Sequence, residues 1–373
     1  LQESVRGMDT VARFGGDEFA ILLEDIDAPR EAVKIARRIL SDISTPFSLQ
    51  GHEVFTSASI GIVLVTEGYE RAESILRDAD TAMYRAKEHG KSRFKVFNQR
   101  MHEEALRTLE LETDLRKASD ARELYVNYQP IVDLENWTIA GFEALLRWKH
   151  ARLGAIGPDE FIPLAEDTGL IFPIGREVLA SACEEAMRWN RLVAQRSGNG
   201  IKPPHVSVNI SGKQLMQPLL IGEVESILEE SGLNPKLLKL EITENVLMEH
   251  IALAEGMLAR LRRIGIGLSM DDFGTGYSSL SYLRQFPIDT IKIDKDFVSA
   301  AIHDKESEAI VSTVISLGHS LGLDVIAEGV ETKEHLELLR MHGCRYAQGY
   351  LFSRPVGADE AERLILEGLK EPA

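Results

Sequence analysis

The chain has 373 residues with a formal net charge of −17, and 44% of its residues are hydrophobic. This length is typical of two domains, and the hydrophobic content is sufficient for a sizeable core. The negative charge excludes a general nucleic-acid-binding surface, which needs a basic face, so we expect no nucleic-acid polymer as a partner. A small anionic ligand remains compatible with this charge if arginines or metal ions correct the field locally.

Cysteine usage and hydropathy indicate the cellular setting. Cys183 and Cys344 are isolated, which excludes a disulfide framework or a zinc cluster and fits a reducing cytoplasm. No apolar run approaches the roughly 20 residues that a membrane helix needs. The sequence begins at Leu1 without Met and in the middle of a domain pattern, so we expect a longer parent protein. Only an upstream segment of that parent would anchor it to a membrane.

Residues 1–98 have the pattern of a partial α+β domain. TVARF and DEFAILLED flank Gly15 and Gly16, as in a β-hairpin. In chain order, the expected elements are this hairpin at 10–25, a helix at 31–43, a strand pair within 52–65 and a helix at 72–90 that stops at its glycine.

The charged stretch 99–120 predicts a connecting helix, and a different pattern begins at residue 121. In 121–373, short apolar strands alternate with helical stretches, as in βα units. Eight such strands in about 250 residues predict a (β/α)8, TIM-like barrel, with functional groups at the C-terminal ends of the strands. The expected strands are 124–132, 139–148, 205–210, 237–242, 266–272, 290–294, 323–329 and 347–352.

Each expected strand carries a polar residue at or near its C-terminal end. Any one of these residues alone is more simply explained as a cap, a turn residue or half of a surface pair. Closing the strands into a ring, however, would bring the whole series to one mouth of the barrel. The series is Gln129, Glu143, Asn209, Glu241, the pair Asp271 and Asp272, Lys292, Glu328 and Gln348.

The five carboxylates in this series would repel one another severely without cations. Oxygen ligands without Cys or His select hard ions such as Mg²⁺ or Mn²⁺. The adjacent Asp271 and Asp272 could bridge two ions about 3.5–4 Å apart, the spacing used in phosphoryl displacement. The Gly-, Thr- and Ser-rich stretch 274–280 is expected to form a loop that closes over the site.

Motifs spread over residues 121–360 resemble the EAL family, the bacterial phosphodiesterases of cyclic di-GMP. GFEALLRWKH at 141–150 is similar to the signature of that family. The matching motifs that surround it are, in order, YQPIV, EITE, DDFGTGYSSL, IKID, AEGVE and QGYLFSRP. The resemblance implies hydrolysis of cyclic di-GMP to linear 5′-pGpG with two Mg²⁺ or Mn²⁺ ions, and a homodimer formed through the barrel.

The resemblance also implies a role for each matching residue. One metal ion would be held by Glu143, Asn209, Glu241 and Asp271, and a second by Asp271, Asp272 and Glu328. Lys292 would orient the attacking water, and it counts as catalytic together with Glu143 and Asp272. The substrate would be lined by Gln129, Leu145, Arg147, Glu331 and Gln348, with Arg147 as the phosphate clamp. Glu244 would anchor the DDFGTG loop.

The first part of the chain resembles the GGDEF domain of diguanylate cyclases. RFGGDEF at 13–19 carries the motif, and YRAKEHGK at 84–91 matches the region near the end of that domain, with Lys91 where the family often has Arg. The motif residues are Gly15, Gly16, Asp17, Glu18 and Phe19, and the two acids would face metal and GTP. RGMD resembles the inhibitory nucleotide site through Arg6 and Asp9. The first strand of such a domain would precede Leu1, so we expect this part to be regulatory or a truncated cyclase.

Two other functions remain open from the sequence. A barrel that binds cyclic di-GMP without cutting it would signal through the connecting helix, but a receptor does not need Asp272, Lys292 and Glu328 together. A Mg²⁺ barrel acting on a carbonyl acid would use Lys292 as the base for proton abstraction. Arg147 and the paired aspartates favour a phosphate substrate over this second alternative.

Overall fold

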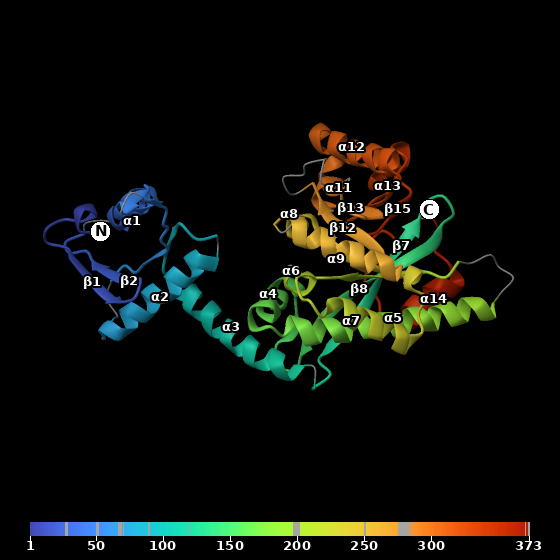
Figure 1. The fold of residues 1–373 in the computed structure, drawn as a ribbon, viewed down its shortest axis with the longest axis horizontal. Coiled ribbons are helices and arrows are strands. Elements are labelled where there is room, and N and C mark those ends of the chain that lie inside the picture. The colour runs from blue at the N-terminus through green and yellow to red at the C-terminus, as the bar shows by residue number, and fades with distance from the viewer. Residues whose placement is uncertain are drawn as a thin grey trace. The chain divides into compact units, whose positions relative to one another are not determined.

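The structure of the chain is a computed structural model (Figure 1). It describes residues 1–26, 29–49, 52–65, 69, 71–88, 90–118, 120–196, 202–249, 251–274, 283, 285–369 and 371, without the side chains of 3, 29, 48, 49, 52 and 99–106. The chain divides into two compact units, Leu1–Leu111 and Glu112–Ala373. Within the described residues, no helix is both long enough and apolar enough to cross a membrane.

The first unit is an α+β arrangement of short strands and two helices. Its elements are η1 Gln2–Ser4, β1 Thr10–Gly15, β2 Glu18–Leu22, α1 Pro29–Ser44, β3 Phe47–Leu49, β4 His52–Val54, β5 Ile60–Ile62, α2 Ala72–Glu88 and β6 Phe94–Val96. Strands β1 and β2 pair antiparallel, which confirms the expected hairpin. Gly16 at its turn has φ = 52°, a conformation that glycine adopts without steric cost.

The strand pair expected within 52–65 is wrong. Strand β4 pairs antiparallel with β3. Strand β5 instead pairs parallel with β6, which follows helix α2 in the sequence. The close approach of α2 to β5 explains this pairing, because a Cβ on Gly61 would lie 1.9 Å from the carbonyl oxygen of Ala79. The helix therefore packs directly on β5 and returns the chain to it as a parallel neighbour, as in a βαβ unit.

The stretch expected to be a connecting helix is helix α3, Gln99–Ala118. Near its C-terminal end, Asp114 Oδ2 lies 3.0 Å from His150 Nε2. His150 Nδ1 accepts hydrogen bonds from the N–H groups of Arg152 and Leu153, so Nε2 carries the proton and donates it to Asp114. This contact ties the end of α3 to the end of the second strand of the first barrel hairpin, β8, Thr138–His150.

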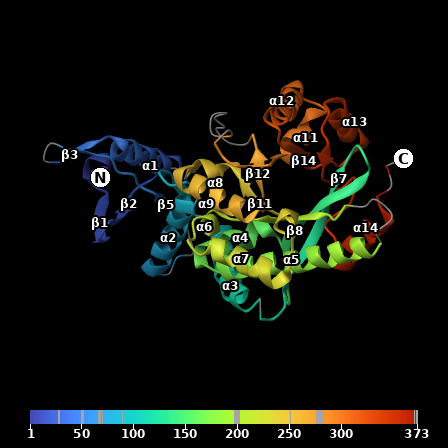
Figure 2. The same ribbon diagram turned by 45° about the vertical axis from the view of Figure 1, so that its right-hand side comes forward.

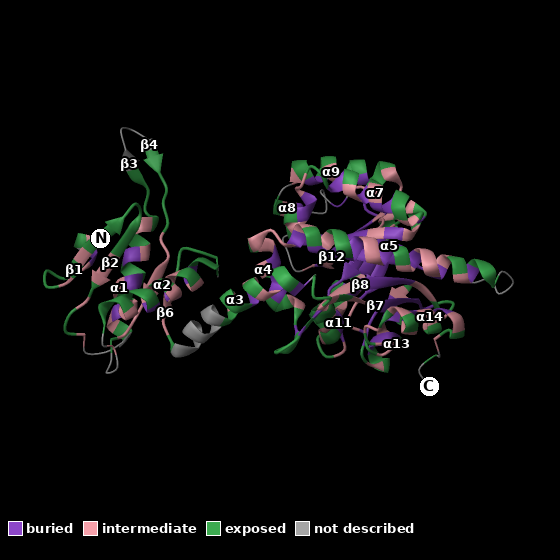
Figure 3. Ribbon diagram, turned by 90° about the horizontal axis from the view of Figure 1, so that it is seen from below, coloured by how far each residue is buried: buried purple, intermediate pink, exposed green. Residues whose placement is uncertain are grey.

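The second unit is built on a closed eight-stranded barrel, as expected. The barrel strands are β7 Leu124–Asp133, β8 Thr138–His150, β10 His205–Asn209, β11 Leu238–Thr243, β12 Gly267–Phe273, β13 Thr290–Ile293, β14 Asp324–Ala327 and β15 Tyr346–Ala347. Pairing of β10 with β8 closes the ring, and the short β9, Gly154–Ile156, extends β8 outside it. In Figure 3 the barrel strands are buried, while the surrounding helices each show an exposed face.

The barrel departs from a regular βα repeat at its first strand. Strand β7 runs antiparallel to both β8 and β15, whereas the other barrel pairs are parallel. Only residues 134–137 connect β7 to β8, and a parallel connection needs a crossover of a dozen residues or more. Two expected strand-end positions are therefore wrong: Gln129 and Glu143 lie in the middle of their strands, paired with each other in register.

Helices surround the barrel, mostly between the parallel strands. They are α4 Pro158–Thr168, α5 Ile171–Gln195, α6 Gly212–Leu215, α7 Leu220–Ser231, α8 Glu244–Glu249, α9 Ile251–Ile264, α11 Lys295–Ala301, α12 Lys305–Leu321, α13 Lys333–Met341 and α14 Ala358–Glu367, with a 3₁₀ turn η2 at Pro235–Leu237. Figures 1 and 2 show α11, α12 and α13 grouped over one part of the barrel. Local signals set the ends of α12: the Asp304 carboxylate accepts from two backbone N–H groups, and Gly322 ends it with φ = 72°.

Candidate active site

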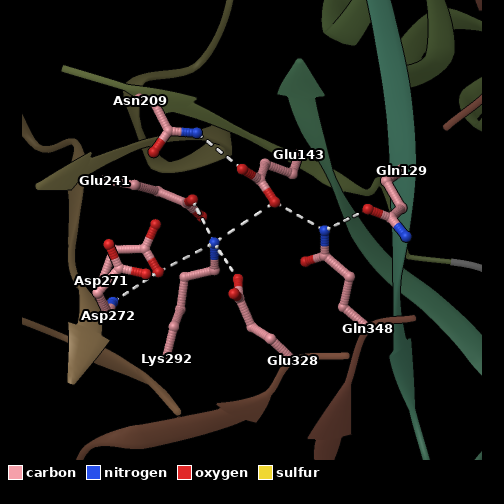
Figure 4. Close-up of polar contacts among 9 residues, drawn as sticks. All are labelled: Gln129, Glu143, Asn209, Glu241, Asp271, Asp272, Lys292, Glu328 and Gln348. Carbon is pink, nitrogen blue, oxygen red and sulfur yellow. Dashed lines mark hydrogen bonds and ion pairs between the residues drawn. The ribbon is translucent and has the colours of Figure 1, made fainter. Parts of the chain in front are cut away.

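A buried lysine surrounded by carboxylates lies inside the barrel (Figure 4). Lys292 is on β13, with 0% of its surface exposed. Its Nζ atom lies 2.5 Å from Glu328 Oε1, 2.6 Å from Glu241 Oε2, 3.4 Å from Glu143 Oε2 and 3.4 Å from Asp271 Oδ1. We call these four acids and the lysine the carboxylate cage. The cage joins residues from five strands or strand ends that are up to 185 positions apart in the sequence.

Two amide side chains fix the orientation of Glu143, and a third, Gln129, completes this wall of the site. Asn209 Nδ2 donates to Glu143 Oε1 at 2.7 Å, and Gln348 Nε2 donates to Glu143 Oε2 at 2.7 Å. Gln348 also donates to Gln129 Oε1 at 3.0 Å. Both oxygens of Glu143 are thus hydrogen-bonded, which holds this carboxylate in one position against the lysine. Because β7 is antiparallel, Gln129 reaches this wall from the middle of its strand.

A β-bulge brings both aspartates of the DDFGTG motif to the site. The register between β12 and β13 shifts between Met270 and Phe273, so Asp271 and Asp272 together face the single residue Lys292. Side chains alternate between faces along a regular strand, but Asp272 has φ = 54°, in the left-handed region. This bulge turns the second carboxylate toward the first, and the oxygens of Asp271, Asp272 and Glu328 lie within 4.8 Å of one another. Asp is one of the few residues that tolerate this backbone conformation.

The start of the DDFGTG loop is hydrogen-bonded to helix α8, which follows strand β11. Glu244, at the N-terminus of α8, is fully buried and its Oε2 accepts a hydrogen bond from Gly274 N at 2.9 Å. This bond joins the first residue of α8 to the backbone at the start of the loop. Of the stretch 274–280 that was expected to close over the site, only Gly274 is among the described residues.

The electrostatics of the cage show an excess of negative charge. Burial disfavours the charged form of Lys292, but the surrounding carboxylates outweigh it and raise its pKa well above the ordinary value. Burial raises the pKa of Glu241 to about 8, with Glu143 adding repulsion that Lys292 only partly offsets. Burial also raises the pKa of Glu328 well above its ordinary value. Glu143 is the exception: despite its burial, Lys292 and the amide donors lower its pKa.

One acid near the cage was missed by the sequence analysis. Asp294 follows Lys292 by two residues, is buried, and caps helix α11 by accepting from Asp296 N at 2.8 Å. Burial, followed by the negative charges of Asp271 and Asp294, raises the pKa of Asp272 to about 6. The spacing of two residues from an inward-facing lysine was the signal that could have identified Asp294.

The donor set of the cage fits divalent metal ions. Its candidate metal ligands are carboxylate oxygens, and the single positive charge of Lys292 faces four carboxylates. Glu241 Oε1 is buried and has no hydrogen-bond partner among the described residues, so an oxygen is left for a cation. Asp271, Asp272 and Glu328 form a second group with ligand atoms close enough to share one ion.

The expected substrate residues lie at different distances from the cage. Leu145 and Arg147 follow Glu143 at two-residue spacing on β8, so all three share a face. Arg147 is partly exposed and its Nη1 donates to the carbonyl oxygen of Leu146 at 2.9 Å. Glu331 is exposed, and among the described residues no hydrogen bond or ion pair connects it or Arg147 to the cage. Gln348 donates directly to Glu143 of the cage, and Gln129 is linked to the cage through Gln348.

In the first unit, the motif residues form the exposed turn of the β1–β2 hairpin. Asp17 and Glu18 are exposed, and Arg13 Nε donates to the carbonyl oxygen of Gly16 at 3.0 Å. Its guanidinium also lies over the Phe19 ring, 5.6 Å from the ring centre.

Arg6 and Asp9 lie together beside this hairpin. Asp9 Oδ2 accepts from Arg6 N at 2.7 Å, and Asp9 Oδ1 accepts from Glu24 N at 3.3 Å. The Arg6 side chain pairs with Glu31 at 3.4 Å and is 53% exposed. The arginine side chain is therefore accessible, while the aspartate holds the local backbone.

Family models match both parts of the chain. The model described as "EAL domain" matches residues 112–355, and the model described as "Diguanylate cyclase, GGDEF domain" matches residues 1–93. The first match includes every residue of the carboxylate cage and the three amide residues beside it, Gln129, Asn209 and Gln348. The second ends at Arg93, just before strand β6.

Two curated relatives are similar over nearly the whole chain. The bifunctional diguanylate cyclase/cyclic di-GMP phosphodiesterase MucR of Pseudomonas aeruginosa is 40% identical over 360 residues, which are 96% of this chain and 51% of MucR. The cyclic di-GMP phosphodiesterase NbdA of the same organism is 37% identical over 98% of this chain and 46% of its own length. The chain therefore spans about half the length of the curated relatives it matches.

A solved structure shares the barrel. The structure described as "PaMucR Phosphodiesterase, c-di-GMP complex" is 41% identical with a TM-score of 0.64, and the match covers 68% of this chain and 99% of that one. The barrel fold, the cage and the family model agree with this similarity. The chain belongs to the EAL-domain family, with a GGDEF-family segment preceding the EAL domain.

Proposed function

We propose that the EAL part of this chain hydrolyses cyclic di-GMP to linear 5′-pGpG. The observation that carries the proposal is the carboxylate cage, in which three buried acids and the partly buried Glu328 surround Lys292 inside the barrel. The similarity to MucR, NbdA and the PaMucR complex supports the substrate, since the name of each of these proteins or structures includes cyclic di-GMP. A barrel that only binds the nucleotide would not require this many buried charges, which are costly unless they serve a bound cation.

The reaction would depend on two divalent metal ions, Mg²⁺ or Mn²⁺. We assign Glu143, Asn209, Glu241 and Asp271 to one ion, and Asp271, Asp272 and Glu328 to the other. When bound, such ions supply Lewis-acid activation of water and charge stabilisation in phosphodiester cleavage. The free oxygen of Glu241 and the close grouping of Asp271, Asp272 and Glu328 support this assignment.

The remaining residues would position the substrate and the attacking water. Lys292, held among acids and therefore protonated, would orient the water and stabilise the negative charge that develops on the phosphate. Arg147, partly exposed and on the same face of β8 as Glu143, would clamp a phosphate. Gln129 and Gln348 would line the nucleotide together with Leu145 and Glu331. Glu244 would keep the base of the DDFGTG loop in place.

We propose that the first part of the chain is regulatory or a truncated cyclase. In this division, residues 1–98 are the partial GGDEF domain, 99–120 the connecting helix and 121–373 the phosphodiesterase. GTP would bind at the hairpin acids Asp17 and Glu18, and Arg6 with Asp9 would bind an inhibitory nucleotide. The protein would act in the cytoplasm, where its two buried free thiols stay reduced, and would pair through the EAL barrel.

Incubation with cyclic di-GMP and Mn²⁺, followed by chromatographic separation of the nucleotides, tests the proposal. We expect linear 5′-pGpG as the product, and none from the Glu143→Gln variant, which keeps the size of the side chain but removes a charged ligand. Binding of cyclic di-GMP with no product from the wild type would identify a receptor and overturn the proposal. The Lys213→Met variant, which alters an exposed lysine on α6, serves as a control that keeps wild-type turnover.

A further inference from the structure

Below the carboxylate cage, two serines face the interior of the barrel. Ser207 precedes Asn209 by two residues on β10, and Ser269 precedes Asp271 by two residues on β12. Side chains two positions apart share a face of a strand; Asn209 donates to Glu143 of the cage, and Asp271 belongs to the cage. Both serines are also buried, at 0% and 1% exposure.

Strand β11 lies between these two strands and places Glu241 beside the serines. Ser269 pairs in register with Glu241, while Ser207 pairs with Lys239, two residues before Glu241 on the same face. One serine therefore lies on each side of the Glu241 strand, at or just below the level of its carboxylate.

Three buried oxygens at this level have no hydrogen-bond partner in the part of the chain that the structure describes. They are Ser207 Oγ, Ser269 Oγ and Glu241 Oε1. The other oxygen of Glu241 contacts Lys292 at 2.6 Å. Buried hydroxyl and carboxylate oxygens in proteins are nearly always hydrogen-bonded, to other groups or to ordered water. Bulky branched residues fill most interior positions of such barrels, so packing does not explain two serines here.

We infer that Ser207 and Ser269 are positioning residues, which hold the free oxygen of Glu241 through one shared buried water. A water molecule can accept from both hydroxyls and donate to one lone pair of Glu241 Oε1, which gives all three oxygens a partner and leaves the second lone pair of Oε1 for a metal ion. The small serine side chains leave the space that a valine or leucine would fill, and the lining is polar, as a buried water requires. The inference rests on the proposed function, because it treats Glu241 as a metal ligand.

The effect should appear in metal binding, which can be measured without nucleotide. Groups that orient a metal ligand by hydrogen bonds typically change metal affinity by about 10–100-fold when they are removed. We therefore expect Ser207→Ala and Ser269→Ala each to weaken Mn²⁺ binding to the full chain by about 10-fold or more in titration calorimetry. Ser207→Thr, which keeps the hydroxyl, should keep most of the affinity.

The matched control is Ile326→Val, which removes one methyl group from the buried strand β14 and leaves every hydroxyl in place. This variant should bind Mn²⁺ as the wild type does. Wild-type affinity in both alanine variants, or an equal loss in Ile326→Val, would overturn the inference. A thermal melt of each variant confirms that it is folded before it is titrated.

A high-resolution crystal structure of the wild-type chain tests the water itself and does not depend on whether the variants fold. We expect a water within hydrogen-bond distance of Ser207 Oγ, Ser269 Oγ and Glu241 Oε1, and its absence overturns the inference. The two proposals can also fail separately. A wild type that binds Mn²⁺ but does not cut cyclic di-GMP overturns the proposed function, while the serine variants still decide this inference.

Discussion

Lys292 Nζ lies 2.6 Å from Glu241 Oε2, and both side chains are almost completely inaccessible to solvent. The two residues come from strands β13 and β11, which are separated by β12. The lysine also contacts three other acids, so its single positive charge is shared by four carboxylates. The cage thus carries more negative charge than its own lysine can neutralise, and this imbalance prepares it to bind cations.

Replacing Lys292 by methionine should abolish most of the turnover. Methionine keeps much of the length of the side chain but removes the charge that would stabilise the developing negative charge on the phosphate. Loss of one such contact typically costs about 10²–10³-fold in kcat. Steady-state kinetics measure this loss, and calorimetry with Mn²⁺ should show a smaller change in metal affinity. A near-normal kcat in Lys292→Met would show that the assigned role is wrong.

Substitutions at Asp272 should separate the role of its carboxylate from that of its backbone. Asp272→Asn and Asp272→Ala both remove the charge, so both should lose turnover. Only the alanine variant is strained by the positive φ of 54°, because Asn tolerates this region and Ala does not. We expect Asp272→Ala to be less stable than Asp272→Asn by about 1 kcal/mol in urea denaturation. Equal stability of the two variants would contradict the strained bulge.

Removing metal ions should stop hydrolysis completely. Asp271, Asp272 and Glu328 offer oxygen ligands in a compact group, which suits ions that bind at about 2.0–2.1 Å, such as Mg²⁺, better than Ca²⁺ at about 2.3–2.6 Å. We expect no turnover in excess chelator, full recovery with Mg²⁺ or Mn²⁺, and inhibition when Ca²⁺ is added to the Mg²⁺ enzyme. Turnover in chelator, or equal rates with Ca²⁺ and Mg²⁺, would contradict this prediction.

His205 should make the protein acid-labile. Burial, with the nearby charge of Lys239, lowers the pKa of His205 to about 3 from 6.5. The pKa of His205 is lower in the folded than in the unfolded protein. Its neutral form therefore contributes fully to the free energy of unfolding above pH 6.5, and this contribution is lost as the pH falls toward 3. Between pH 7.5 and 5.5 the free energy of unfolding should therefore fall by about 1.4 kcal/mol from this group alone.

Two single histidine-to-glutamine variants, one at His205 and one at His303, isolate this effect. His205 lies against Gly141, where a Cβ would come within 2.4 Å of the ring, so a side chain of similar size is needed. His205→Gln should flatten the decline of stability between pH 7.5 and 5.5, measured by urea denaturation at each pH. His303→Gln alters an exposed histidine and should leave the decline unchanged. A decline that persists in His205→Gln would show that other groups cause it.

Much of the fold and of the site could be predicted from the sequence. Alternating apolar strands and helical stretches indicated an eight-stranded barrel, and the acids of the cage were identified as a series of polar residues on those strands. These features are local: a strand pattern and a carboxylate in it are visible in a few neighbouring residues. The order of the motifs then carried the family resemblance along the chain.

The tertiary structure decided how these residues meet. The antiparallel course of β7 and the mid-strand positions of Gln129 and Glu143 follow from pairings between strands, although the four-residue connection before β8 already excluded a crossover helix. The bulge at Asp271 and Asp272, and the contact of Asp294 with Asp272, depend on the register of β12 against β13. Register is set by contacts across the whole closed barrel, and a shift by one residue reverses the face of every side chain. The sequence by itself therefore determined which acids the barrel carries, and only the closed sheet determined that two adjacent aspartates face one lysine.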